Sequence, residues 1–175
     1  TQGLLHFWTI GGTGLSTGRL EIAERHAQAG WEIREIVVPA IPLSAIFDQM
    51  GPDLVHWMKI DVEGMEVDVL SSWGAHPARP QVLIIEATAP MTQDRTDAEW
   101  LHLVEDRGYR HVLFDGLSSY FVHESCSDRA ERLSLNPNVF DDINVSWHHF
   151  TARALAGEHT ALVERTANEA ARLRE

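Results

Sequence analysis

The chain has 175 residues, 44% of them hydrophobic, which is enough for one domain with a buried core. Its 26 acidic and 14 basic side chains give a formal net charge of −12, which argues against nucleic acids and anionic membranes as partners because both are bound by clustered Lys and Arg. The single cysteine, Cys126, excludes an intrachain disulfide, and neither a signal peptide nor an apolar run of ~20 residues is present, so we expect a soluble cytoplasmic protein.

The first part of the sequence alternates predicted strands and helices. Gly30 suits the left-handed position that ends a helix, and Pro39 closes the strand that follows. The expected elements are, in chain order, a strand over 4–10, a Gly-rich loop over 11–18, a helix from 20 to 30, a strand over 33–38 and a short helix over 42–50.

The central part continues the alternation and ends in a hairpin. Residues 81–87 form a nearly continuous apolar run, which is typical of a parallel strand buried on both faces. The alternation predicts an α/β sheet that is mostly parallel, with an antiparallel final hairpin. The expected elements are strands over 54–61, 81–87, 109–114 and 120–122, and helices over 64–73 and 97–106.

The last part of the chain predicts a separate helical segment. Residues 134–143 are rich in Asn, Asp and Pro and are expected to be irregular. From Trp147 on, apolar residues recur at steps of three and four, which predicts a long amphipathic C-terminal helix. We therefore expect a domain over 1–145 and, over 146–175, a helix that serves as a linker to another domain or as a homo-oligomer contact.

Charged side chains gather at the end of the strand predicted over 54–61. Lys59, Asp61 and Glu63 alternate with apolar residues, so an extended backbone places all three on one side. Glu86 ends the next apolar run along the chain. Because the carboxyl ends of parallel strands meet at the edge where open α/β sheets bind ligands, we expect the three carboxylates to converge there.

Two interpretations of this convergence remain open. In the structural one, Lys59 pairs with Asp61, and Glu63 is a stabilising anion near the positive end of the following helix. In the functional one, Asp61, Glu63 and Glu86 raise one another's pKa or hold a hard cation such as Mg²⁺ through oxygen ligands.

The residues around this motif resemble those of the FkbM methyltransferases. The resemblance extends over residues 5–143, and it implies an S-adenosylmethionine-dependent O-methyltransferase with a Rossmann-like class I methyltransferase sheet. The implied acceptor is a hydroxyl of a sugar, a glycan or a small natural product. The segments that carry the resemblance are 14–17, 57–70, 82–86 and 114–122.

The chemistry of methyl transfer assigns roles to the motif residues. A hydroxyl acceptor must be positioned and must lose a poorly acidic proton, so Asp61 is expected to be the general base or a metal ligand. Glu63 and Glu86 would orient the hydroxyl or share the metal, and Lys59 would tune Asp61 through its charge. Ser16 and Thr17 lie in a Ser-containing loop that we place on the substrate side.

One departure from the family pattern concerns the cofactor. The Gly-rich turn after the family's first strand, and the acidic residue that binds the ribose one strand later, have no counterpart upstream of Leu4. The chain therefore resembles the carboxy-terminal portion of the domain, lacking the first strands, with unknown cofactor-binding residues and weak expected binding of S-adenosylmethionine.

The glycines at 12, 14 and 18 imitate a dinucleotide fingerprint, but the following strand ends at Pro39 instead of an acidic residue. We therefore interpret them as a substrate-side loop or a plain turn. The alternative to an enzyme is a non-catalytic fragment or interaction module of a larger glycan-processing protein.

Overall fold

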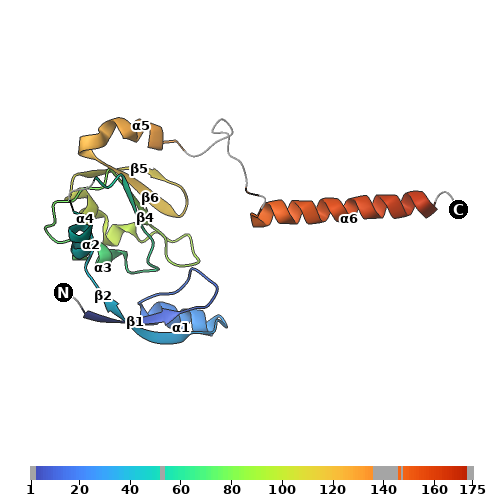
Figure 1. The fold of residues 1–175 in the computed structure, drawn as a ribbon, viewed down its shortest axis with the longest axis horizontal. Coiled ribbons are helices and arrows are strands. Elements are labelled where there is room, and N and C mark those ends of the chain that lie inside the picture. Colours follow the sequence, from blue (N-terminus) through green and yellow to red (C-terminus); the bar gives the residue numbers. More distant parts are fainter. Residues whose placement is uncertain (1–2, 52–53, 136–145, 147, 173–175) are drawn as a thin grey trace. The chain divides into compact units, whose positions relative to one another are not determined.

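The structure is a computed structural model that describes residues 3–51, 54–135, 146 and 148–172. The chain divides into two compact units, residues 1–136 and residues 137–175, which are described separately (Figure 1). The functional residues predicted from the sequence all lie in the first unit.

The first unit begins with a two-stranded sheet and a helix. β1 (Gly3–Thr9) pairs antiparallel with β2 (Arg34–Ala40), and α1 (Leu20–Gln28) connects them. Leu5 pairs with Val38 and Phe7 with Ile36, and these four side chains are partly buried, whereas Val37 and Pro39 on the other face of β2 are exposed. The predicted end of α1 is confirmed, because Gly30 adopts φ +92°.

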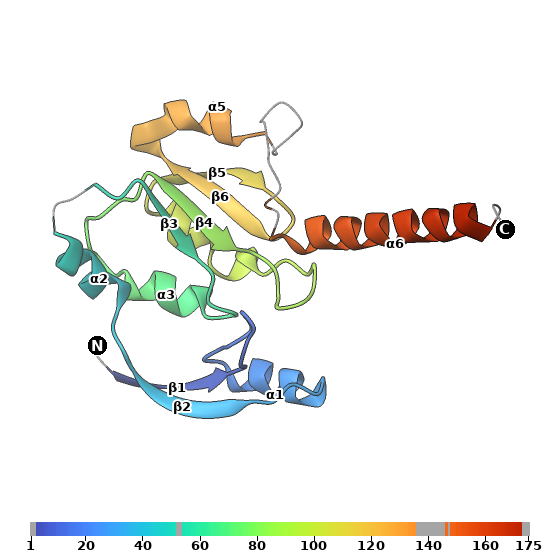
Figure 2. The same ribbon diagram turned by 45° about the vertical axis from the view of Figure 1, so that its right-hand side comes forward.

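A four-stranded sheet forms the centre of this unit. Its strand order is β3-β4-β6-β5, in which β3 and β4 are parallel and the other two pairs are antiparallel (Figures 1 and 2). The predicted final hairpin is thus confirmed. The strands are β3 (Trp57–Ile60), β4 (Val82–Glu86), β5 (Tyr109–Phe114) and β6 (Ser118–His123).

Helices cover both faces of this sheet. In Figures 1 and 2, α3 lies on one side of the strands and α5 lies on the other. The main core forms on the α3 side, where Leu83 and Ile85 of β4 are fully buried together with Trp73 and Trp100. The helical segments are α2 (Leu43–Met50), α3 (Glu66–Ser72), η1 (Asp97–Glu99), α4 (Leu101–Glu105), η2 (Glu124–Arg129) and α5 (Ala130–Leu133).

The predicted mostly parallel sheet is not confirmed, and the fold is a mixed α/β arrangement. Within the described part of the chain, β3 and β4 are the one parallel pair of strands. The first two predicted strands, instead of joining the central sheet, pair antiparallel with each other. Over residues 4–7 and 35–40 these strands alternate between exposed and partly buried side chains, as antiparallel strands with one solvent-facing side do, whereas central parallel strands are apolar throughout.

The second unit contains the helix expected near the C-terminus, α6 (Phe150–Arg172). Leu155, Leu162 and Val163 of this helix are exposed. The expectations for Trp147 and for the irregular segment beyond residue 135 lie outside the described residues. No helix among the described residues combines the length and the apolar character needed to cross a membrane.

Candidate functional site

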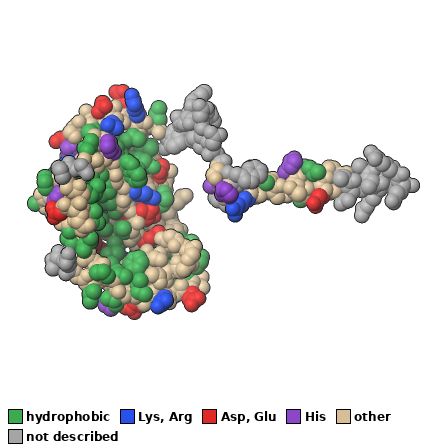
Figure 3. All heavy atoms as spheres, viewed as in Figure 1, with side chains coloured by type: hydrophobic (Ala, Val, Ile, Leu, Met, Phe, Trp, Pro, Cys, Tyr) green, Lys and Arg blue, Asp and Glu red, His purple; other side chains and the backbone are tan. Residues whose placement is uncertain are grey.

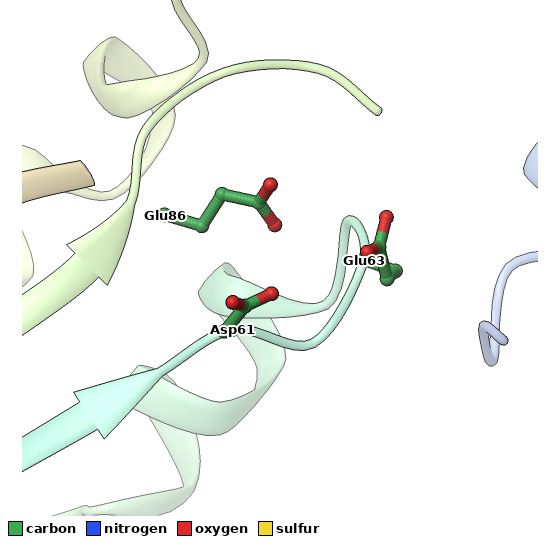
Figure 4. A group of neighbouring side chains, drawn as sticks. All are labelled: Asp61, Glu63 and Glu86. Atoms are coloured by element: carbon green, nitrogen blue, oxygen red, sulfur yellow. The ribbon is translucent and has the colours of Figure 1, made fainter. Parts of the chain in front are cut away.

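The parallel pairing of β3 and β4 places three carboxylates together. Ile60 pairs with Ile85, so Asp61 and Glu86 leave their strands side by side. One ligand oxygen from each of Asp61, Glu63 and Glu86 lies within 4.8 Å of those from the other two, and Figure 4 shows the three side chains around a common space. The predicted convergence is confirmed, and we call these three residues the carboxylate cluster.

Lys59 faces the same side of β3 as Asp61. Its Nζ lies 2.7 Å from Asp61 Oδ2, and the hydrogen bond to Asp61 raises the pKa of Lys59. The ion pair of the structural interpretation is therefore present. Both side chains are more than a third exposed, so the pair contributes little to folding stability. Its effect is to balance one negative charge of the cluster.

Glu86 is the buried member of the cluster, with 7% of its surface exposed. Burial raises the pKa of Glu86 to about 8, and the negative charges of Asp61, Glu63 and Glu66 and a hydrogen bond with Asp61 add to the increase. The raised pKa favours the protonated form of Glu86, which can donate a hydrogen bond to Asp61. A neutral Glu86 beside an ion-paired Asp61 is a division of charge that acid–base sites use.

Glu63 occupies an unusual backbone conformation. Its φ is +49°, and Gly64 follows with φ +92°, so two consecutive residues adopt the left-handed region. The Oε2 atom of Glu63 is buried without a hydrogen-bond partner in the described protein, and burial, Asp61 and Glu66 raise the pKa of this side chain. α3 begins at Glu66, so Glu63 lies just before the N-terminus of this helix, and its interpretation as a stabilising anion there stays open.

Glu66 fixes the turn that carries Glu63, a role that sequence reasoning missed. Its side chain is 6% exposed, and Oε1 accepts hydrogen bonds from the backbone N–H groups of Val62 and Gly64, both at 3.3 Å. A glutamate early in a helix that binds N–H groups upstream of it is a known capping arrangement. The position of Glu66, two residues after Gly64, was the signal in the sequence that could have indicated this role.

Thr17 and Arg19, which lie between β1 and α1, form hydrogen bonds to the same turn. Thr17 is fully buried and donates a hydrogen bond of 2.8 Å to the carbonyl of Glu63. Arg19 Nε donates to the carbonyl of Gly64 at 3.1 Å. Thr17 thus supports the turn with its hydroxyl, and its place in a substrate-side loop stays a prediction.

A cavity of about 710 Å³ opens beside the carboxylate cluster, between β1, β2 and α3. Asp61 and Glu63 line it, and so does Ser16, whose Oγ also accepts a hydrogen bond from the backbone of Ile10. A second cavity, of about 480 Å³, lies on the other side of the sheet and is lined by Trp57, Ile84 and residues near α5. Trp57 is 64% exposed and therefore shields no core.

Comparison with known proteins gives one match. The family model described as the methyltransferase FkbM domain matches residues 1–111, which is more than half of the chain and includes the whole carboxylate cluster. No curated protein and no solved structure matches the chain.

Proposed function

The chain belongs to the FkbM methyltransferase family, and on that basis we propose that it works as an S-adenosylmethionine-dependent O-methyltransferase on a hydroxyl of a sugar, a glycan or a small natural product. The observation that carries this proposal is the carboxylate cluster at the ends of two parallel strands. Methyl transfer to a hydroxyl requires that a weakly acidic proton be removed as the new bond forms, and a positioned carboxylate can accept it.

The cluster divides this work among its members. Asp61 accepts the hydroxyl proton, and Lys59 and the protonated Glu86 stabilise its negative charge before the transfer. Glu63 lines the cavity beside the cluster, so its carboxylate can accept a hydrogen bond from the acceptor and orient it. In this assignment Glu86 stays protonated at neutral pH and is not the base.

The cofactor fits the described residues only in part. S-adenosylmethionine supplies an activated methyl group on a positively charged sulfur, which the acidic cluster complements in charge. The backbone around Gly11 and Gly12 is open, but β2 ends at Ala40 without an acidic residue for a ribose hydroxyl. We therefore assign no cofactor-binding residue to this chain.

A divalent cation is a second way to use the same three carboxylates. Ligand oxygens of octahedral Mg²⁺ are about 3.0 Å apart when adjacent and about 4.2 Å apart when opposite, so the cluster oxygens, which lie within 4.8 Å of one another, would move closer together to bind one ion. Calorimetric titration with MgCl₂ tests this use. Binding that is lost in Asp61→Asn and Glu63→Gln would support it, and an absence of heat at millimolar Mg²⁺ would leave Asp61 as a base alone.

The reaction class is tested with S-adenosylmethionine that carries a ¹³C-labelled methyl group. The protein, as expressed from its complete gene, is incubated with a panel of neutral hydroxylated acceptors, and the products are examined by carbon NMR. The proposal expects a methyl ether signal. Transfer that gives only N-methyl or C-methyl products would contradict O-methylation while leaving the family membership intact.

A further inference from the structure

The cavity beside the carboxylate cluster has the composition of a binding site for an amphipathic molecule. We propose that it holds the apolar part of a neutral or cationic hydroxyl-bearing acceptor and excludes anionic acceptors. This inference rests on the proposed function, because it names the substrate class of the same site. Figure 3 shows hydrophobic side chains gathered on the visible face of this unit.

The apolar lining comes from elements on both sides of the cavity. Leu5 and Phe7 of β1 face it from one side, and Met65 and Val69, at and within α3, face it from the other. All four side chains are partly buried, so they already shield one another while leaving surface for a ligand. A cavity of about 710 Å³ is within the range of small-molecule sites, ~300–1,000 Å³.

The polar lining is suited to hydroxyl groups. Ser16, Ser44 and Ser71 contribute hydroxyls that can donate to or accept from a polyol, whereas the Ser72 hydroxyl is bound to the backbone of Val69 and Leu43. When ionised, Asp61 and Glu63 act only as hydrogen-bond acceptors. A ligand whose apolar part lies against Phe7 and Val69 would therefore place a hydroxyl near the group that accepts its proton.

The charge of the lining selects against anions. The charged residues that line the cavity are Asp61, Glu63 and Asp68, and no Lys, Arg or His is among its described lining residues. Arg19 pairs with Asp68, and Lys59 pairs with Asp61, so the nearby cations are already engaged. A phosphate, sulfate or carboxylate on the acceptor would meet like charge without a compensating partner.

Two matched ligands test this inference by binding alone. Octyl β-D-glucoside and octyl β-D-glucuronide share the alkyl chain and the sugar ring, and only the second carries a carboxylate. Calorimetry below the micelle concentrations is expected to give at least ~10-fold tighter binding of the glucoside, the factor that ~1.4 kcal/mol of repulsion would produce. Asp61→Asn should reduce the difference between the two affinities, because it should improve the affinity for the glucuronide.

Variants locate the binding. Val69→Glu, or Leu5→Glu if the first variant unfolds, should weaken glucoside binding at least ~10-fold, because a charge would then occupy the apolar lining. Leu133→Glu, in the cavity on the other side of the sheet, is the matched control and should leave it unchanged. Equal affinities for the two ligands, or a loss of binding only in Leu133→Glu, would overturn the inference. Binding without methyl transfer would contradict the proposed function alone.

Discussion

At the scale of single residues, the burial of Glu86 has a measurable consequence for stability. The pKa of Glu86 is raised from an ordinary 4.5 to about 8, so the folded state holds a proton that the unfolded state releases. This contribution to stability is complete below pH 4.5 and is lost as the pH rises to about 8. Glu86→Gln keeps the shape of the side chain and removes the titration.

The free energy of unfolding of Glu86→Gln, relative to the natural protein, should therefore increase between about pH 5 and pH 8 by up to ~4 kcal/mol and then level off. Urea denaturation at several pH values measures this difference. Glu24→Gln, at an exposed position of α1, controls for the loss of one acidic side chain. A difference between Glu86→Gln and the natural protein that does not change with pH would show that Glu86 is not held protonated.

The sequence predicted the convergence of Asp61, Glu63 and Glu86 because their positions follow from strand ends alone. It could not predict what Glu66 and Thr17 do. Both bind backbone groups of the turn at residues 62–64, and such contacts depend on a left-handed turn that the sequence does not specify. The positive φ of Glu63 is the kind of strained conformation that concentrates at functional sites.

At the scale of elements, Gly64 is the point where the turn of the carboxylate cluster packs closely against helix α1. Its φ of +92° disfavours any other residue, and a Cβ built on it would lie 2.4 Å from Ile22 Cδ1. Gly74 has φ +57° with open space around it. Gly74→Ala therefore measures the free-energy cost of placing a side chain at a positive φ without a steric clash. Gly74→Ala should cost about 1 kcal/mol, whereas Gly64→Ala should cost ~2–4 kcal/mol because it adds overpacking.

A double-variant cycle separates the two costs. Ile22→Val removes the atom that would clash, so it should destabilise the Gly64→Ala protein less than it destabilises the natural one. Thermal or urea denaturation gives all the required values. Additive effects, or equal costs for Gly64→Ala and Gly74→Ala, would mean that α1 does not pack closely against the turn.

The predicted bounds of two strands of the central sheet agree closely with the structure. β5 has the predicted bounds of 109–114, and β4 is one residue shorter at each end than the predicted 81–87. The strand predicted over 54–61 is reduced to Trp57–Ile60, at one edge of the sheet. The helical turns of residues 124–133 were missed because they are short and carry little apolar periodicity.

At the scale of the whole molecule, α6 presents apolar side chains that need a partner surface. Leu155 and Leu162 are seven residues apart and exposed, and an isolated helix is only marginally stable in water. We expect a second copy of the chain to cover them, with at least a dimer in solution. Light scattering at tens of micromolar tests this expectation.

Replacing Leu155 and Leu162 with Asp should convert that dimer to a monomer, because two charges would be buried in the contact. Glu158→Gln and Glu164→Gln, on the same helix, are controls that leave these leucines in place. A protein that is monomeric from the start, or a dimer that survives both Asp substitutions, would exclude this contact.

The central claim is that the carboxylate cluster performs the chemistry of this methyltransferase. Asp61→Asn preserves the size of the side chain and removes the charge that accepts the hydroxyl proton. Its rate of methyl ether formation should fall by at least ~10²-fold, with the circular dichroism spectrum unchanged. Asp94→Asn, at an exposed position outside both cavities, should retain full activity. Turnover of Asp61→Asn close to that of the natural protein would contradict the account.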